Sequence, residues 1–117
     1  MQDFRELKAW QKAHRAALDV YRVSARFSAD ERFGLTSQMR RAAVSVGANL
    51  AEGCGRGSDA DFARFAQIAF GSANELEYLV LLGRDLNEMR EDDANQLFAQ
   101  ISEAKRMVTA LIRTLRS

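Results

Sequence analysis

The sequence predicts an all-α protein, a single-domain antiparallel bundle of four helices in up-down-up-down order over residues 1–117. No proline occurs in the chain, as suits a protein built of uninterrupted helices. Apolar residues recur at helical spacing along four long segments, and no segment alternates with the period of a β-strand. With 47% hydrophobic and 28% charged residues, the composition is that of a globular domain able to bury its own core.

The first helix is predicted over residues 4–26, where Asp3 and Glu6 form a capping-box pattern. Its apolar residues fall on two stripes. One stripe contains Phe4, Leu7, Leu18 and Tyr21, and the other contains Trp10, Ala13, Ala17, Val20 and, just beyond the helix, Phe27. A helix in a simple monomeric bundle needs only one apolar stripe, so the pair predicts neighbours on two sides.

The second helix is predicted over residues 36–55, after the connector "FSADERFG". In that connector Ser28 and Glu31 form another capping-box pattern, and Gly34 ends the short turn. Thr36 or Ser37 is expected to cap the helix. The core-facing positions at helical spacing are Met39, Ala42 or Ala43, Val46 and Leu50, and glycines 53, 55 and 57 end the helix.

The third and fourth helices are predicted over residues 59–89 and 92–116. Ser58, with Asp61 three residues later, begins the third helix, and the acidic turn "REDDAN" leads into the fourth. The third has a near-heptad seam of Phe62, Phe65, Ala69, Ala73, Leu76, Leu79 or Val80, Gly83 and Leu86. The fourth has the clearest periodicity, through Ala94, Leu97, Ile101, Ala104, Val108, Leu111 and Leu115.

Small residues follow one face of the second helix. Ala43, Gly47, Ala51 and Gly55 lie at steps of four, so they share that face. A glycine in mid-helix costs about 1 kcal/mol relative to alanine, so some interaction must offset Gly47. We expect close packing against another helix, from the same chain, from a second copy, or from both.

A polar stripe runs beside these small residues: Arg41, Ser45, Asn49, Glu52 and Arg56. If it faces water, it contributes little, because exposed ion pairs are weak. If it lies at a subunit contact, Asn49 and Glu52 need partners, and Arg40 and Arg41 supply charge. We favour the second interpretation because the helix has few other outward polar groups. The predicted subunit-interface or structural network is Arg40, Arg41, Ala43, Ser45, Gly47, Asn49, Glu52 and Arg56.

Charge is unevenly spread although the net charge is only +1. Residues 1–27 and 94–117 are rich in bases, and residues 58–93 are rich in acids. Oppositely charged helices lying side by side would explain this pattern most simply, and a functional surface is the alternative. On that alternative the candidate nucleic-acid contacts are Lys8, Lys12, Arg15, Lys105, Arg106 and Arg113. Against it, no aromatic residue is interleaved with these bases on their helices.

No catalytic, metal or cofactor site is expected, and we predict that the protein is not an enzyme. The only histidine, His14, has Gln11 three residues before it, so the Glu-x-x-His pairs of di-iron bundles are missing. Cys54 and Ser45 have no evident histidine base. The glycine-rich "GCGRGSDAD" places Asp59 and Asp61 where they would repel a phosphate.

The sequence also bears on location. One cysteine cannot form an internal disulfide, which suits a reducing cytoplasm. "MQDFRELKAW" lacks the apolar core of a signal peptide. No run approaches the ~18 apolar residues of a membrane span. We expect a cytoplasmic protein with no membrane partner.

Three stretches resemble a known family: "FRELKAWQKAH", "ERFGLTSQMRRAAVSVGANLAEGCGR" and "FARFAQIAFGSANELEYLV". Together they cover most of the chain and resemble the four-helix-bundle protein family, also called the 23S rRNA intervening-sequence protein family. That resemblance implies a small bacterial cytosolic protein, folded as an antiparallel four-helix bundle and assembled as a homopentamer. A related protein, the accessory variability protein of diversity-generating retroelements, is a pentameric barrel that binds nucleic acid and a reverse transcriptase.

The resemblance therefore implies self-association and an RNA- or DNA-binding or accessory role. A protein-interaction scaffold that binds no nucleic acid is the alternative. Two positions depart from the family pattern, since Ser28 and Gly47 stand where the family commonly has proline. Proline would kink the second helix, whereas Gly47 permits a bend without enforcing one.

Overall fold

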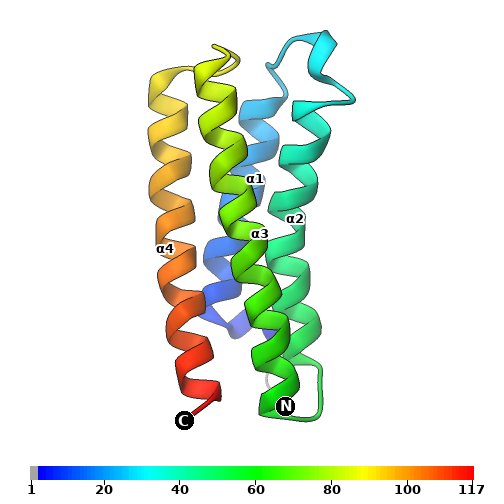
Figure 1. Cartoon of the computed structure of the whole chain (residues 1–117), viewed down its shortest axis with the longest axis vertical. Helices are drawn as coiled ribbons and strands as arrows, with labels where there is room; N and C mark the ends of the chain where they lie inside the picture. Colours follow the sequence, from blue (N-terminus) through cyan, green and yellow to red (C-terminus); the bar gives the residue numbers. More distant parts are fainter. Residues whose placement is uncertain (1–2) are drawn as a thin grey trace.

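Residues 3–117 are described by the computed structural model, in which four long helices run alternately up and down (Figure 1). The helices are α1 (Lys8–Ser24), α2 (Leu35–Cys54), α3 (Asp59–Asp85) and α4 (Glu91–Leu115). Two short 3-10 turns, η1 (Phe4–Glu6) and η2 (Ala29–Glu31), precede α1 and α2. No strand occurs in residues 3–117, and the bundle measures 43 × 23 × 20 Å. The predicted four-helix bundle is confirmed.

Each helix packs against the helices before and after it, and α4 returns to pack against α1. Within the described residues α1 and α3 are diagonal to one another and do not pack together, and neither do α2 and α4. Large apolar side chains fill the centre, among them Met39, Leu50, Leu97 and Ile101, none more than 1% exposed. Burying each such side chain stabilises the fold by about 1.5–3 kcal/mol. Alanines 9, 13, 42, 66, 69 and 73 occupy other core positions and allow the helices to approach closely.

The chain enters α1 through a break that the sequence did not predict. Asp3 Oδ1 accepts a hydrogen bond from the backbone N–H of Arg5 at 2.9 Å, so Asp3 caps η1 rather than α1. Leu7 is extended and separates η1 from α1, and its side chain is 8% exposed. The predicted helix over residues 4–26 is therefore a short turn followed by a helix from Lys8 to Ser24.

The connection between α1 and α2 is held by a residue from a distant part of the chain. The backbone N–H and Oγ of Ser28 donate to the Glu88 carboxylate at 2.8 and 3.0 Å. Ser28 therefore does not form the expected box with Glu31, whose Oε1 instead accepts from the N–H of Leu35 at 3.2 Å. As a result α2 begins at Leu35 after Gly34, and neither Thr36 nor Ser37 is its cap.

The two ends of α3 differ in how well the sequence predicted them. Ser58 Oγ accepts from the N–H of Asp61 at 3.2 Å, as the sequence predicts. The helix ends at Asp85, before the predicted Met89. Asn87, at φ 61°, adopts the left-handed conformation that asparagine tolerates, and Glu88 N–H reaches the Gly83 carbonyl at 2.9 Å. This is a Schellman stop with asparagine in place of the usual glycine.

α2 and α3 approach one another closely at Gly53. A Cβ at this position would lie 2.8 Å from the Phe65 Cβ and 2.9 Å from the Phe62 ring. Gly53 thus allows short-range packing between α2 and α3, although it lies outside the predicted small-residue face. None of the described helices has both the length and the apolarity needed to span a bilayer.

Candidate nucleic-acid interface

An open groove of about 490 Å³ lies between α3 and α4, and we call it the α3/α4 groove. Ser102, Arg106, Thr109 and Arg113 follow one face of α4 at steps of four, three and four, so all four line the groove. Lys105, Ala110 and Phe70 complete its walls. The structure thus brings Lys105, Arg106 and Arg113, three of the predicted nucleic-acid contacts, into one groove that also contains two hydroxyl groups.

The three bases in the groove are not equally available. Lys105 Nζ donates to Glu77 Oε1 at 3.0 Å and lies 5.5 Å from the centre of the Phe70 ring. Its charge is therefore partly compensated within the protein. Arg106 and Arg113 are exposed and pair with no acid in residues 3–117. These two guanidinium groups are the free cations of the groove, able to bind the oxygens of an anion in pairs.

Phe70 is the groove residue that the sequence did not reveal. The α4 bases have no aromatic neighbour along their own helix, and this counted against a nucleic-acid surface. Phe70 comes from α3, so only the packing of α3 on α4 places a ring beside Lys105. Cations beside an aromatic ring are typical of surfaces that bind unpaired bases and their phosphates.

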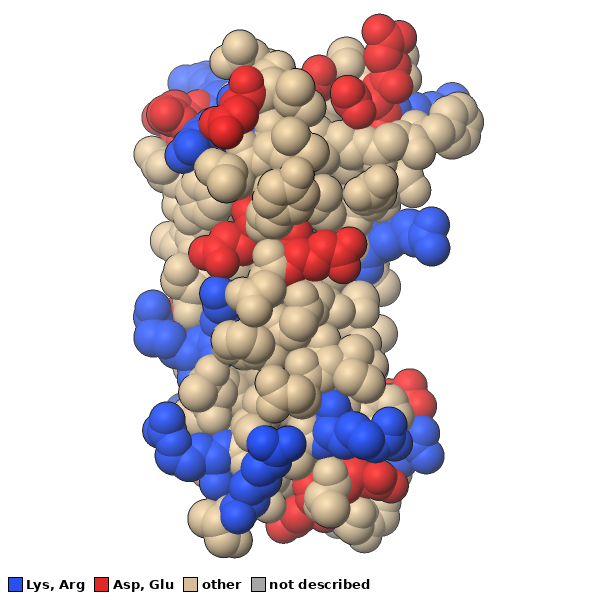
Figure 2. All heavy atoms as spheres, in the orientation of Figure 1, with Lys and Arg blue, Asp and Glu red and all other residues tan. Residues whose placement is uncertain are grey.

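The other predicted contacts, Lys8, Lys12 and Arg15, lie on α1 and do not line the α3/α4 groove. They are nevertheless close to α4, because Lys12 Nζ lies 3.4 Å from Glu103 Oε1 on that helix. The basic face of α1 therefore lies beside α4. Figure 2, which views the molecule onto α3, shows basic side chains gathered mainly toward the lower end and acidic ones across the middle and upper end.

The predicted small-residue face packs against a side chain of α1. A Cβ on Gly47 would lie 3.4 Å from Trp10 Nε1, and Ala43 is 1% exposed. The Trp10 ring in turn stacks on His14, with ring centres 4.7 Å apart. The small side chains of α2 therefore make room for a tryptophan of the same chain, and Gly55 lies exposed at the end of the helix.

Residues of the predicted polar network on α2 make hydrogen bonds to both neighbouring helices, α3 and α1. Toward α3, Ser45 Oγ lies 2.8 Å from Ser72 Oγ, and within α2 Asn49 Nδ2 donates to the Ser45 carbonyl at 2.8 Å. Toward α1, Arg40 Nε donates to Ser24 Oγ at 2.8 Å. The contacts of Ser45 with Ser72 and of Arg40 with Ser24 tie α2 to both of its neighbours within one copy.

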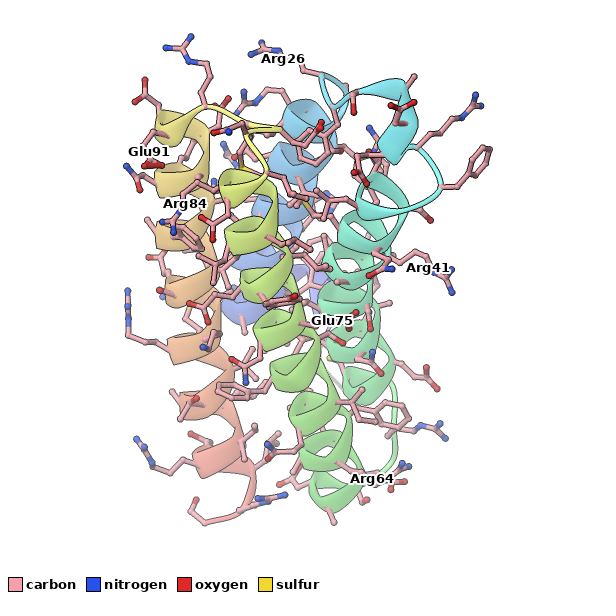
Figure 3. All side chains as sticks on the ribbon, turned by 45° about the horizontal axis from the view of Figure 1, so that its top comes forward. Arg26, Arg41, Arg64, Glu75, Arg84 and Glu91 are labelled. Carbon is pink, nitrogen blue, oxygen red and sulfur yellow. The ribbon has the colours of Figure 1, made fainter. Side chains whose placement is uncertain are left out.

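The remaining network residues lie nearer the solvent. Glu52 and Arg56 form an ion pair at 3.0 Å with side chains 57% and 42% exposed, so it contributes little to stability. Arg41 is exposed and makes no ion pair with any described residue. In Figure 3 it projects from α2 away from the bundle.

Cys54 is poorly placed to act as a nucleophile. Cys54 is buried, and burial raises the pKa of its thiol above the ordinary value of 9.0. A raised pKa disfavours the thiolate that a nucleophilic cysteine requires. In the described part of the chain no group of three or more His, Cys, Asp or Glu side chains is arranged to hold a metal ion.

Comparison with known proteins agrees with this fold. A protein of unknown function from the S23 ribosomal protein family of Bacteroides thetaiotaomicron superposes with a TM-score of 0.84. The two are 21% identical, and the match covers 96% of this chain and 99% of the other, so it shows the shared fold. A search of the curated proteins found no match. The family model described as 23S rRNA-intervening sequence protein matches residues 5–110. Because that match spans most of the molecule, the chain belongs to the 23S rRNA-intervening sequence protein family.

Proposed function

We propose that this protein is a non-catalytic, cytoplasmic module that self-associates and binds nucleic acid, with the α3/α4 groove contacting the phosphate backbone. The observation that carries the proposal is the pair Arg106 and Arg113, exposed, unneutralised and held along one groove beside two hydroxyl groups. Such a groove supplies cations for phosphates and hydroxyl donors for their oxygens. The family name refers to an intervening sequence of 23S rRNA, so structured RNA is the first ligand to test.

Self-association would strengthen a patch of this size. Two free arginines per copy give weak binding, because each phosphate contact contributes only a modest, salt-sensitive term. Repetition of the groove around an oligomer converts later contacts into intramolecular ones and raises the overall affinity. The family resemblance implies five copies.

The test is fluorescence anisotropy with labelled structured RNA and with duplex DNA over a series of salt concentrations. The wild type is expected to bind at low ionic strength, with an affinity that falls as salt rises. The double variant Arg106→Glu/Arg113→Glu is expected to lose most of the affinity and to reduce the salt slope by about 1 per arginine removed. The matched control, Arg26→Glu/Arg32→Glu, makes the same charge change at the opposite end of the bundle and is expected to bind nearly as the wild type does.

Two results would contradict the proposal. One is the absence of salt-dependent binding by the wild type at low ionic strength. The other is an equal loss in both double variants, which would indicate attraction by overall charge rather than binding in the groove.

A protein-interaction scaffold is the second candidate, and exposed apolar side chains favour it. Phe33, in the connection between α1 and α2, is 89% exposed, and Leu86, near the end of α3, is 50% exposed. Isolated apolar residues are normal on surfaces, but these two both lie toward one end of the bundle. A partner that stays bound after nuclease treatment, and that Phe33→Ala releases, would support the scaffold and argue against nucleic acid as the primary ligand.

A further inference from the structure

The α3/α4 groove contains an aromatic ring as well as its bases. Phe70 packs partly against the core and partly lines the groove. Neither ring–ring contact within residues 3–117 involves Phe70, so no other aromatic side chain covers it. Lys105 Nζ approaches the ring centre to 5.5 Å but is held by Glu77 Oε1. The groove side of the Phe70 ring is therefore open to a planar group of a ligand.

Two amide side chains flank Phe70 on α3. Gln67 lies three residues before it and Asn74 four residues after it, so both share its side of the helix. Both are exposed, and neither side chain hydrogen-bonds to another of the described residues. Amides offer both donors and acceptors, as the edges of nucleobases do. A base that stacks on the ring thus finds hydrogen-bonding groups one turn to either side.

The free cations of the groove are spaced along α4, so a strand that follows the helix can meet both. Arg106 and Arg113 are seven residues apart, which is about 10 Å at a rise of 1.5 Å per residue. Successive phosphates of a stacked strand rise by about 3.4 Å, so the two arginines span about three nucleotides. Thr109 is exposed between them and adds a hydroxyl group to the same face.

A duplex cannot use the ring and the arginines together. Its bases are paired and stacked on one another, so none of them presents a face to Phe70. A second strand beside the first would also bring more phosphates toward Glu75 and Glu77, the acids of α3 within two turns of Phe70. Figure 2 shows acidic side chains across this middle part of the molecule.

We propose that the α3/α4 groove binds an unpaired segment of RNA, with one base stacked on Phe70 and phosphates of the same strand held by Arg106 and Arg113, an inference that rests on the proposed nucleic-acid binding. A loop or a single strand meets these demands, because unpaired nucleotides can turn a base into the groove while their phosphates follow α4. Phe70 then selects unpaired RNA, whereas the arginines attract RNA of any form.

The test compares an oligouridine single strand with a fully paired RNA duplex by fluorescence anisotropy at low salt. Phe70→Leu keeps an apolar side chain against the core and removes the ring. Its affinity for the single strand is expected to fall about tenfold, the scale of one lost stacking contact, and its affinity for the duplex to stay that of the wild type. The control is Phe33→Leu, which removes an exposed ring that also lies near a cation, Arg32 at 5.4 Å, but far from the groove. It is expected to bind both RNAs as the wild type does.

Phe70→Trp gives a second readout that does not depend on affinity. An indole ring also stacks on bases, so this variant is expected to keep the wild-type preference for the single strand. Its added tryptophan emission is expected to be quenched by the single strand and not by the duplex. The wild type, which has only Trp10, supplies the background. Circular dichroism checks that both variants at Phe70 remain folded.

Failure of this proposal is distinct from failure of the proposed function. An unchanged affinity of Phe70→Leu for the single strand, an equal loss for both RNAs, or an unquenched Phe70→Trp would overturn stacking on Phe70 and leave binding by the arginines intact. The proposed function itself fails if the wild type binds neither RNA, or if Arg106→Glu/Arg113→Glu binds as the wild type does.

Discussion

At the scale of single residues, glycines on neighbouring helices have opposite surroundings. A Cβ on Gly53 would overlap Phe65 and Phe62, whereas a Cβ on Gly71 would meet nothing within 4 Å. Gly53→Ala is therefore expected to destabilise the protomer by about 1–3 kcal/mol, because it forces α2 away from α3. Gly71→Ala is expected to stabilise it by about 0.5–1 kcal/mol through better helix propensity. Urea unfolding of the two variants measures both changes, and a loss of stability in both would contradict the packing described here.

The ion pair between Lys105 and Glu77 limits the charge available in the α3/α4 groove. Glu77→Gln leaves Lys105 without its carboxylate and is expected to raise the affinity for RNA severalfold at low salt, because one more cation can meet a phosphate. Anisotropy of the variant against the wild type measures the change. The control is Glu52→Gln, which also removes an ion-paired carboxylate, 57% exposed against 38% for Glu77, away from the groove. An unchanged or lower affinity for Glu77→Gln would show that Lys105 does not contact the ligand.

Cys54 gives a prediction about pH. Burial raises the pKa of its thiol above 9.0 in the folded state, so ionisation of the thiol favours the unfolded state. The stability that this group contributes is complete below its ordinary pKa and is lost as the pH rises toward the folded value. The wild type is expected to lose more stability than Cys54→Ala when urea unfolding is moved from neutral to strongly alkaline solution. Equal losses would show that the thiol is not desolvated.

At the scale of helices, the sequence predicted periodicity better than helix ends. The core positions of α4 that spacing identified, from Ala94 to Val108, are all buried. Spacing succeeds because the buried stripe of a helix is a property of its own sequence. The connection before α2 depended on a distant partner, because Ser28 donates to Glu88 and does not form the expected box with Glu31. The residues around Ser28 in the sequence do not show that Glu88, 60 residues away, binds it.

The Ser28–Glu88 contact is itself testable. Glu88 joins the connection after α3 to the connection after α1 through two hydrogen bonds, one of them to a backbone N–H. Glu88→Ala is expected to destabilise the protein by roughly 1 kcal/mol, because bonds to a charged group are stronger than neutral ones but this contact is open to solvent. Thermal unfolding measures the change. Asp30→Ala, at an exposed acid in η2, should be close to neutral, and an equally small effect of Glu88→Ala would show that the contact is unimportant.

At the scale of the whole molecule, the distribution of charge depends on which helices are neighbours. Sequence alone favoured oppositely charged segments side by side, and the acidic α3 packs against α4, whose bases Lys105, Arg106 and Arg113 lie in its second half. It could not show that the basic α1 also packs against α4, or that α1 and α3 are diagonal. For the same reason it identified Lys105, Arg106 and Arg113 as candidates but not Phe70, which reaches the groove from another helix.

The most direct test of the account is to find where nucleic acid touches the protein. Structured RNA carrying photoreactive uridines is crosslinked to the wild type, and the modified peptides are identified by mass spectrometry. Crosslinks are expected at Phe70 and at residues 102–113, the two walls of the α3/α4 groove. Crosslinks confined to the connection between α1 and α2, at the opposite end of the bundle, would contradict it (Figure 1).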